Sequence, residues 1–330
     1  MSRHKSLGIK RRTLLGGACV AGLTAAAWPV SIAFRRELTI PPGRLRISTG
    51  GVGGVYYAYG TGIVAAVRAR LPQLAPEVIV TAASIENIRL VVSGEAEIGF
   101  TLADSAGTAH FGAPPFLVPT EVAALARLYD NYLHLVVHPD RPLRTVADLR
   151  GQRVSVGASG SGTELTATRL LAQVGLNAST DLQATWLGVD DSAAAFAAGT
   201  LDAFFFSGGI PTLAIDALAK WFPIQLMDLG GMVSPMRHSY GEVYAERTIP
   251  GSTYRLGAPV TTVGVPNYLV VSPTMDSDLA YAIIETLFAE RALLAAAHPE
   301  GRRLDRGAAI NTYPLRLHPG AERYYRAIKR

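Results

Sequence analysis

The chain has 330 residues, of which 49% are hydrophobic and only 17% charged. This balance excludes a disordered chain and supplies a substantial core, spread over one long domain or two. Five basic residues and no acidic residue lie within 1–33, which leaves 26 Lys and Arg against 26 Asp and Glu in the body. The body is therefore formally neutral and lacks the basic excess of a nucleic-acid-binding protein.

Residues 1–33 have the layout of a bacterial export signal. A positive segment precedes the uncharged run Leu14 to Phe34, which is rich in Ala, Gly, Val and Leu. Arg11-Arg12 before this run resembles a twin-arginine signal. Small residues ending at Ala27 and at Ala33 suit cleavage, although the run is also just long enough for an uncleaved anchor. We predict a periplasmic body that is released from its signal peptide or tethered by an N-terminal anchor.

The single cysteine, Cys19, lies in this leader, so the body contains no thiol. A disulfide, a cysteine nucleophile and a thiolate metal site are thereby excluded from the body. His134 and His138 are four residues apart, a spacing that suits a shared metal in a helix. The β-rich run 133–137 instead predicts a strand, which would hold the two residues roughly 13 Å apart. We expect His134 to lie in the core, and we predict neither a metal nor another cofactor.

Strands and helices alternate along the body. We expect these elements in chain order: strand 45–48, helix 55–71, strand 78–81, helix 86–92, strand 97–101, strand 153–156, helix 164–174, helix 193–198, strand 201–206, strand 260–271 and helix 276–297. His298 and His318 each precede a proline at a segment end, where a capping role is expected. Strands separated by helices favour βαβ units and a parallel sheet.

Each half of the body opens with a glycine-rich turn between a strand and a helix. The turns span 49–54 and 157–163. Glycine lets a backbone approach a ligand closely, and the free N–H groups of a helix start attract an anion. Tyr56 stands at the third glycine of a dinucleotide fingerprint, and Glu164 rather than a lysine follows the second turn. We interpret both turns as uncharged anion cradles suited to carboxylates, with plain tight turns as the alternative.

Small polar groups also follow the other predicted strands. The segment Ser84 to Asn87 ends the second strand, a position that lines the crevice in α/β proteins, although Ser84 could instead cap the next helix. Ser207 and Gly208 follow the most apolar strand. The side chain of Arg127 is a candidate cation for a carboxylate, but a salt bridge with Glu121 or Asp130 would satisfy it equally well.

Three tyrosines, Tyr56, Tyr57 and Tyr59, follow the first turn. One of them must face the core at this spacing, so we expect a single ligand contact from the three.

Four segments, taken together, resemble the TRAP-transporter solute receptors of the TAXI type. They are 48–57 (STGGVGGVYY), 160–163 (GSGT), 201–211 (LDAFFFSGGIP) and 317–325 (LHPGAERYY), and the resemblance extends over roughly 44–328. It implies a periplasmic-binding-protein fold of type II, with two βα lobes that close on a small organic acid or amino acid. It also implies delivery of that ligand to an ion-gradient-driven TRAP-type membrane permease.

The ligand-binding segments of that family fall on 51–57, 84–87 and 159–163 here. The sequence departs from the family at Asp130-Asn131, where a glutamate often follows the tyrosine, and this leaves the ligand's identity open. We predict a glutamate, 2-oxo acid or dicarboxylate. The candidate ligand-binding residues are Gly51, Gly53, Gly54, Tyr56, Tyr57, Ser84, Asn87, Ser159, Gly160, Ser161, Gly162, Thr163, Ser207 and Gly208.

The predicted architecture is α/β, with one lobe formed by 44–136 and 266–330 and the other by 137–265. We expect a separate sheet in each lobe and a hinge near 136–140 and 263–266. Reversible binding without turnover by a monomer is the predicted activity. Two alternatives stay open: a membrane-anchored ligand sensor, and a hydrolase that uses Ser159 or Ser161.

Overall fold

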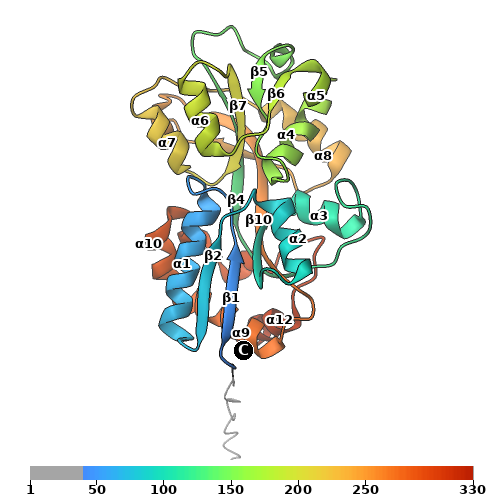
Figure 1. Cartoon of the computed structure of the whole chain (residues 1–330), viewed down its shortest axis with the longest axis vertical. Helices are drawn as coiled ribbons and strands as arrows, with labels where there is room; N and C mark the ends of the chain where they lie inside the picture. Colours follow the sequence, from blue (N-terminus) through green and yellow to red (C-terminus); the bar gives the residue numbers. More distant parts are fainter. Residues whose placement is uncertain (1–39, 330) are drawn as a thin grey trace, which may run out of the picture. The chain divides into compact units, whose positions relative to one another are not determined.

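A computed structural model describes residues 40–329 (Figure 1). The predicted export signal lies outside this range. Within the described range, no helix combines the length and the apolar character that a membrane crossing requires.

The strands form one mixed sheet in the order β2-β1-β3-β10-β4-β7-β5-β6, with β8 beside β4 and β9 beside β10. Their bounds are β1 Gly43–Ser48, β2 Leu74–Ile79, β3 Ile98–Leu102, β4 Ala123–Val137, β5 Arg153–Ser155, β6 Gln183–Thr185, β7 Ala203–Gly208, β8 Gln225–Leu226, β9 Ala245–Ile249 and β10 Val260–Val271. The α-helices are α1 Val55–Arg70, α2 Ser84–Ser93, α3 Ala103–Phe111, α4 Gly162–Ala172, α5 Ala178–Asp181, α6 Val189–Ala197, α7 Leu213–Ala219, α8 Val233–Tyr240, α9 Ser277–Ala289, α10 Arg291–Ala297, α11 Arg306–Ala309 and α12 Pro319–Ala327.

Two groups of three parallel strands flank a central antiparallel pair. β1 pairs in parallel with β2 and β3, while β5 pairs in parallel with β6 and β7. The two long strands β4 and β10 run antiparallel between these groups. We call β1–β3 with α1–α3 and α9–α12 the β1 side, and β5–β7 with α4–α8 the β5 side. Figure 1 shows the β5 side above the β1 side, with β4 and β10 running through both.

The hydrogen-bonded ladder is continuous from one side to the other. β10 pairs with β3 of the β1 side through 267–271 and with β9 through 260–264, and β4 pairs with β7 of the β5 side. The expectation of a separate sheet in each lobe is therefore wrong, because two shared strands connect the two parallel groups. The described residues 40–329 belong to one compact unit. The predicted lobe boundaries stay a prediction.

The core forms where helices cover the faces of this sheet. On the β1 side, Ile47, Ile63 and Ile283 belong to one fully buried cluster that joins β1, α1 and α9. On the β5 side, Phe196 of α6 packs edge-on against Phe204 of β7, with ring centroids 5.4 Å apart. This packing of helices on the sheet holds the strands in place. The loops at their carboxyl ends form the cavity described below.

The predicted elements are confirmed with shifts of a few residues at their ends, which is usual for element boundaries. One helix differs: the run predicted as 276–297 breaks at Glu290, whose φ of −103° and ψ of 30° separate α9 from α10. The predicted caps are confirmed, since the His298 and His318 side chains accept hydrogen bonds from the amides of Glu300 and Gly320.

Candidate ligand-binding site

A cavity of about 100 Å³ lies between the β1 side and the β5 side. Its lining comes from the carboxyl ends of all six parallel strands, together with Tyr129 and Asn131 of β4. The full lining is Gly50, Gly51, Gly54, Val55, Tyr56, Thr81, Ala82, Ala83, Ser84, Leu102, Tyr129, Asn131, Gly157, Ala158, Ser161, Gly162, Thr163, Leu187, Gly188, Val189, Phe206, Ser207 and Gly208. The crevice outside the carboxyl ends of parallel strands is where open α/β sheets bind ligands. A cavity of this size has room for several water molecules or one small solute.

Nine of the predicted ligand-binding residues line this cavity. They are Gly51, Gly54, Tyr56, Ser84, Ser161, Gly162, Thr163, Ser207 and Gly208. Of the three neighbouring tyrosines, only Tyr56 reaches the cavity, whereas Tyr59 is fully buried against Phe100 and Tyr129. The two glycine-rich turns thus lie on opposite sides of one pocket.

Five predicted residues lie outside the lining, and each for a physical reason. Gly53 donates its N–H to Asp190 Oδ2 at 3.0 Å, so its backbone contacts α6 of the β5 side rather than the cavity. Tyr57 is half-buried on another face of α1. Asn87 is fully buried, and its Nδ2 donates to the carbonyls of Thr49 and Phe100.

The other two belong to the second turn. Ser159 is exposed, and the N–H of Gly160 donates to Glu164 Oε2 at 2.7 Å. The turn thus lines the cavity through Ser161 to Thr163 and not through its tip. Nine of the predicted residues line the cavity, and their contact with a ligand stays a prediction.

The pocket hydroxyls of Ser161, Thr163 and Ser84 share one feature: each accepts a hydrogen bond from a backbone amide. Ser161 Oγ accepts the amide of Glu164 at 3.0 Å as the N-cap of α4, and Thr163 Oγ1 accepts the amide of Ser207 at 3.1 Å. Ser84 Oγ accepts the amide of Leu102 at 3.1 Å. A hydroxyl has one proton to donate as well as its lone pairs. Because the backbone uses a lone pair of each, these side chains are set to act as donors.

A chain of side-chain hydrogen bonds runs along the cavity floor. The Tyr56 hydroxyl donates to Asn267 Oδ1, and Asn267 Nδ2 donates to Asn131 Oδ1 at 2.7 Å. Asn131 Nδ2 then donates to the Ser207 carbonyl at 3.1 Å and, more weakly, to Ser207 Oγ at 3.4 Å. The chain links α1 to β7 through both long strands, and every donor in it points toward the β5 side.

Burial raises the pKa of Tyr56 well above its ordinary value, and a hydrogen bond with Ser84 opposes this shift. The phenol is therefore neutral at physiological pH and keeps the proton that it donates to Asn267. The Ser84 hydroxyl also contacts this phenol, so Ser161, Thr163 and Ser207 are the hydroxyls of the β5 side left to meet a ligand. On β4, the buried Tyr129 hydroxyl of the lining has no hydrogen-bond partner among the described residues and is a further donor.

Two glycines of the second turn have no room for a side chain, Gly162 because of the β1 side and Gly157 because of its own turn. A Cβ at Gly162 would lie 2.6 Å from both Leu102 Cδ1 and Ser84 Oγ, which belong to the β1 side. Gly157 has a φ of +98°, and a Cβ there would lie 2.6 Å from Thr163 Cγ2. Ala83 also has a positive φ, 94°, although it is not glycine. Strained backbone of this kind clusters at binding sites.

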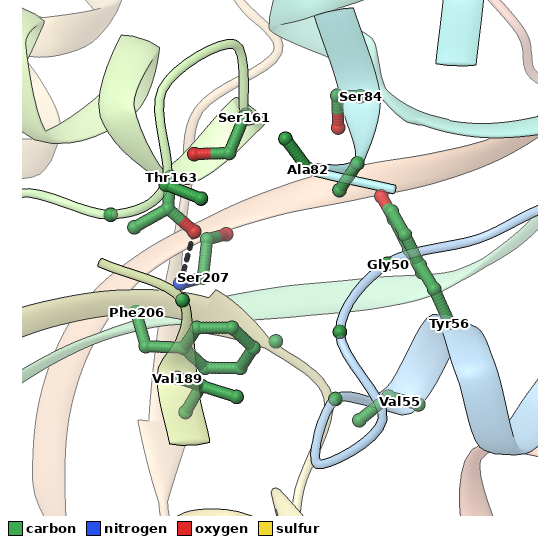
Figure 2. A pocket seen from close by; sticks show the side chains of 18 of the residues that line it. Gly50, Val55, Tyr56, Ala82, Ser84, Ser161, Thr163, Val189, Phe206 and Ser207 are labelled. Atoms are coloured by element: carbon green, nitrogen blue, oxygen red, sulfur yellow. Dashed lines mark hydrogen bonds between the residues drawn. The ribbon is translucent and has the colours of Figure 1, made fainter. Parts of the chain in front are cut away.

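Polar and apolar side chains occupy different parts of the lining. In Figure 2 the hydroxyls of Ser84, Ser161 and Thr163 lie toward the top of the view, while Val189 and Val55 lie at the bottom. The ring of Phe206 lies beside Val189, below the hydroxyl of Ser207. No Asp, Glu, Lys, Arg or His is among the described residues that line the cavity.

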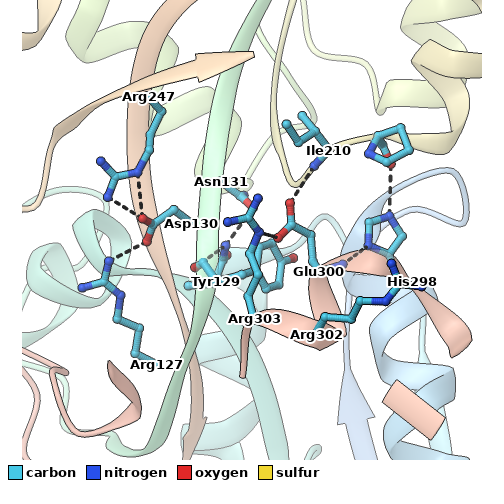
Figure 3. A network of polar contacts seen from close by, with 12 residues as sticks. Arg127, Tyr129, Asp130, Asn131, Ile210, Arg247, His298, Glu300, Arg302 and Arg303 are labelled. Atoms are coloured by element: carbon cyan, nitrogen blue, oxygen red, sulfur yellow. Dashed lines mark hydrogen bonds and ion pairs between the residues drawn. The ribbon is translucent and has the colours of Figure 1, made fainter. Parts of the chain in front are cut away.

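The charged residues of β4 belong to a neighbouring network (Figure 3). Asp130 accepts hydrogen bonds from Arg127 at 2.7 Å and from Arg247 Nε at 2.9 Å. Arg127 is thus paired with Asp130, one of the two partners considered from the sequence, and lies outside the lining. Asp130 faces these arginines, whereas its neighbour Asn131 lines the cavity.

Glu300 joins the two sides beside the pocket. Its Oε1 accepts the amide of Ile210 at 3.1 Å, and Arg303 Nε lies 2.6 Å from its Oε2 (Figure 3). Burial raises the pKa of this carboxyl group. The contact connects the segment after β7 to the segment after α10.

Sequence reasoning missed part of the lining, above all Asn131, Phe206 and the segment 187–189. The segment follows β6, so the rule that ligands meet the carboxyl ends of parallel strands would have found it had β6 been recognised. Asn131 interrupts an apolar strand with a polar side chain, which is a usable signal. Phe206 gave no signal, since an apolar residue in a buried strand is expected to face the core.

Residues 47–328 match the NMT1-like family. The chain belongs to this family. Among solved structures, a protein of Bordetella bronchiseptica RB50 is 19% identical over 86% of this chain and 89% of its own, with a TM-score of 0.50. The periplasmic aliphatic sulphonate binding protein SsuA from Escherichia coli is 18% identical over 86% and 82%, with a TM-score of 0.48.

The substrate binding protein of an amino acid ABC transporter is 13% identical over 78% of this chain and all of its own, with a TM-score of 0.48. At these identities the likeness concerns the fold alone. The predicted α/β fold is confirmed, since strands and helices alternate and the strands form one mixed sheet.

Proposed function

We propose that this member of the NMT1-like family is an extracytoplasmic solute receptor that captures a small organic acid in the pocket and delivers it to a membrane permease. The observation that carries the proposal is the polarity of the pocket hydroxyls. Ser161, Thr163 and Ser207 each already accept a hydrogen bond from the chain and keep a proton to donate. A carboxylate is acceptor-only and matches such a set.

Two helix starts add to this donor set. α1 begins at Val55 with no capping side chain and no acidic residue in its first turn, and Val55 lines the cavity. α4 begins at Gly162 on the other side, but Ser161 caps it and Glu164 lies in its first turn, so its contribution is the smaller of the two. First-turn amides lack partners within a helix and favour negative charge, each helix contributing about 0.3–1 kcal/mol.

The partner and the location follow from the sequence. The motif resemblance to TAXI-type receptors favours a TRAP-type permease, and residues 1–33 favour export to the periplasm with or without cleavage. Closure of two lobes about β4 and β10 would enclose the ligand, since these two strands connect the sides. A membrane-anchored sensor would use the same pocket and differs only in its partner.

The hydrolase alternative lacks support at either serine. Ser159 is exposed outside the cavity, and Ser161 caps α4. A serine nucleophile needs an adjacent general base, usually histidine, and no histidine is among the described residues of the lining. Binding without turnover is the activity that this arrangement supports.

A thermal-shift screen tests the proposal. The full chain is heated with monocarboxylates, 2-oxo acids, amino acids and dicarboxylates, with alkanesulfonates as the comparison anions. A carboxylate at 100 times its Kd should add about 2.7 kcal/mol to the free energy of unfolding. The control is Ser207→Ala at the same ligand concentration, in which the shift should shrink.

Two results would contradict the proposal: no shift with any carboxylate, or hydrolysis of an ester or amide that Ser161→Ala abolishes. Stabilisation by sulfonates alone would retain a receptor but overturn its assignment to carboxylates.

A further inference from the structure

We infer that the pocket selects a monoanion with an apolar body, such as a 2-oxo monocarboxylate with an alkyl side chain, over dicarboxylates and amino acids. The inference rests on the proposed function and narrows the ligand class within it.

The polar part of the lining can satisfy one acidic group. Ser161, Thr163 and Ser207 supply three hydroxyl donors, and all three side chains come from the β5 side. A carboxylate has two oxygens that each accept more than one hydrogen bond. Three donors on the same side of the pocket therefore lie within the acceptor capacity of a single carboxylate, which has about four lone-pair sites.

The remainder of the lining, within the described residues, carries no charged side chain and is largely apolar, and its unpartnered Tyr129 hydroxyl is a neutral donor. Val55 is 2% exposed and Val189 is 5% exposed, and both lie with the Phe206 ring on the side of the cavity away from the Ser161 hydroxyl (Figure 2). Leu102 and Leu187 extend this apolar lining. An alkyl group gains from contact with such a surface, whereas a charged group loses its water without replacement.

No counter-charge compensates a second ionic group. A second carboxylate would need Arg or Lys, and an α-ammonium would need Asp or Glu, yet neither type is among the described lining residues. A buried charge without a partner is strongly unfavourable.

Three carboxylates beside the pocket loops are already used by the backbone. Glu86 accepts the amide of Ala82 at 2.5 Å, Glu164 accepts that of Gly160 at 2.7 Å, and Asp190 accepts that of Gly53 at 3.0 Å. Their repulsion of a bound anion grows with its charge, so it opposes a dicarboxylate more than a monocarboxylate. None of them is in the lining, so none is placed to pair with an ammonium group.

Three five-carbon ligands separate the classes by calorimetric titration of the full chain. 2-Oxopentanoate carries one carboxylate and an alkyl end, 2-oxoglutarate adds a second carboxylate, and 2-aminopentanoate exchanges the oxo group for an ammonium. We expect 2-oxopentanoate to bind at least about tenfold more tightly than either of the others, as for a charge left without a partner.

Equal or tighter binding of 2-oxoglutarate or 2-aminopentanoate would overturn the inference and leave the receptor proposal intact. Absence of binding by 2-oxopentanoate would also overturn it. The proposed function fails only if every carboxylate in the thermal-shift screen fails as well.

A charge variant tests the physical cause. Leu187 is half-buried in the lining, so Leu187→Lys adds a cation, with Leu187→Met as the neutral control. The ratio of the 2-oxoglutarate Kd to the 2-oxopentanoate Kd should fall at least about tenfold in Leu187→Lys and stay unchanged in Leu187→Met. An unchanged ratio in a folded Leu187→Lys protein would contradict the claim that missing counter-charge sets the selectivity.

Discussion

The hydroxyl groups of the pocket show how single residues decide what a neutral site can bind. Ser161 and Thr163 accept backbone amides at 3.0 and 3.1 Å, and Ser207 accepts a weaker bond from Asn131. Their protons are left for a ligand, so the site favours acceptors although it carries no formal charge. This polarity is invisible in the sequence, because it depends on which amide meets which hydroxyl.

Ser207→Ala gives the cleanest test of one donor. Its hydroxyl has only a 3.4 Å contact with Asn131 Nδ2, so its loss should change stability little. Ligand affinity should fall by about 0.5–1.5 kcal/mol, the contribution of one neutral hydrogen bond. Calorimetry on this variant is compared with Ser159→Ala, an exposed serine outside the lining. Equal affinities in the two variants would exclude Ser207 from the site.

The second turn separates stability from binding at adjacent residues. Gly160 has a φ of +78° and lies outside the lining, so Gly160→Ala should lower the free energy of unfolding by about 1–2 kcal/mol and leave affinity unchanged. Ser161→Ala should lower both, because it removes an N-cap, about 0.5–2 kcal/mol, together with a ligand donor. Urea titration gives the stability and calorimetry the affinity. Loss of binding in Gly160→Ala would show that the tip of the turn, Ser159 and Gly160, takes part in ligand binding.

Because His134 is buried, we predict that the free energy of unfolding falls in acid. Its Nδ1 lies 3.1 Å from the Phe206 carbonyl and its Nε2 3.1 Å from the Tyr254 hydroxyl, and burial lowers its pKa from 6.5 to about 4. Between these values the unfolded chain binds a proton that the folded chain does not. Stability is therefore retained above pH 6.5 and falls as the pH drops toward 4, by up to about 3 kcal/mol.

His134→Gln should remove this part of the pH dependence. Urea unfolding of both proteins between pH 4 and 7 measures it, and the other titrating groups cancel in the difference. Parallel pH profiles would show that His134 does not contribute.

At the scale of elements, the loop before α1 is held against α6 and α7. Gly53 donates to Asp190 at 3.0 Å, and its carbonyl accepts the amide of Ala214 at 3.3 Å. A Cβ at Gly53 would overlap the Asp190 carboxylate and lie 2.9 Å from the Ala214 Cβ. This glycine therefore sets how closely the β1 side approaches the β5 side.

Gly53→Ala should weaken ligand binding about tenfold, or 1.4 kcal/mol, without touching the ligand, because it pushes the two walls of the pocket apart. Val52→Ala is the control from the same loop, since Val52 is exposed and lies outside the lining. Calorimetric titration compares the two. A loss in Val52→Ala as large as in Gly53→Ala would show that the contact with Asp190 is not responsible.

The elements that carry the two glycine-rich turns were predictable from the sequence. The run 260–271 gave β10, and the two strand–turn–helix units gave β1–α1 and β5–α4, because apolar periodicity and glycine turns are local signals. The break at Glu290 was not predicted, nor were the short strands and helices β6, β8, β9, α3, α5, α7, α8, α11 and α12, because a short segment carries little periodicity. Local signals also do not show that Asn87, a polar residue of the right loop, is buried beneath the site.

At the scale of the molecule, contacts on both flanks of the pocket join the two sides. Besides the Gly53 contact, Asp104 of α3 accepts Thr166 Oγ1 of α4 at 2.8 Å and the Tyr244 hydroxyl at 3.0 Å. With β4 and β10 shared by both sides, the pocket lies between two walls that are connected at its floor and at both edges. The sequence indicated two walls but not the shared sheet, because strand pairing across the chain leaves no local pattern.

The central claim is that a small organic acid occupies this pocket. Native mass spectrometry of the full chain, purified without denaturation and titrated with the best carboxylate of the thermal-shift screen, tests it most directly. We predict one bound ligand per chain in the wild type and in Ser159→Ala, and weakened binding in a Thr163→Val, Ser207→Ala double variant that remains folded. Equal ligand occupancy in the wild type and the double variant, or no bound carboxylate in any of them, would contradict the account.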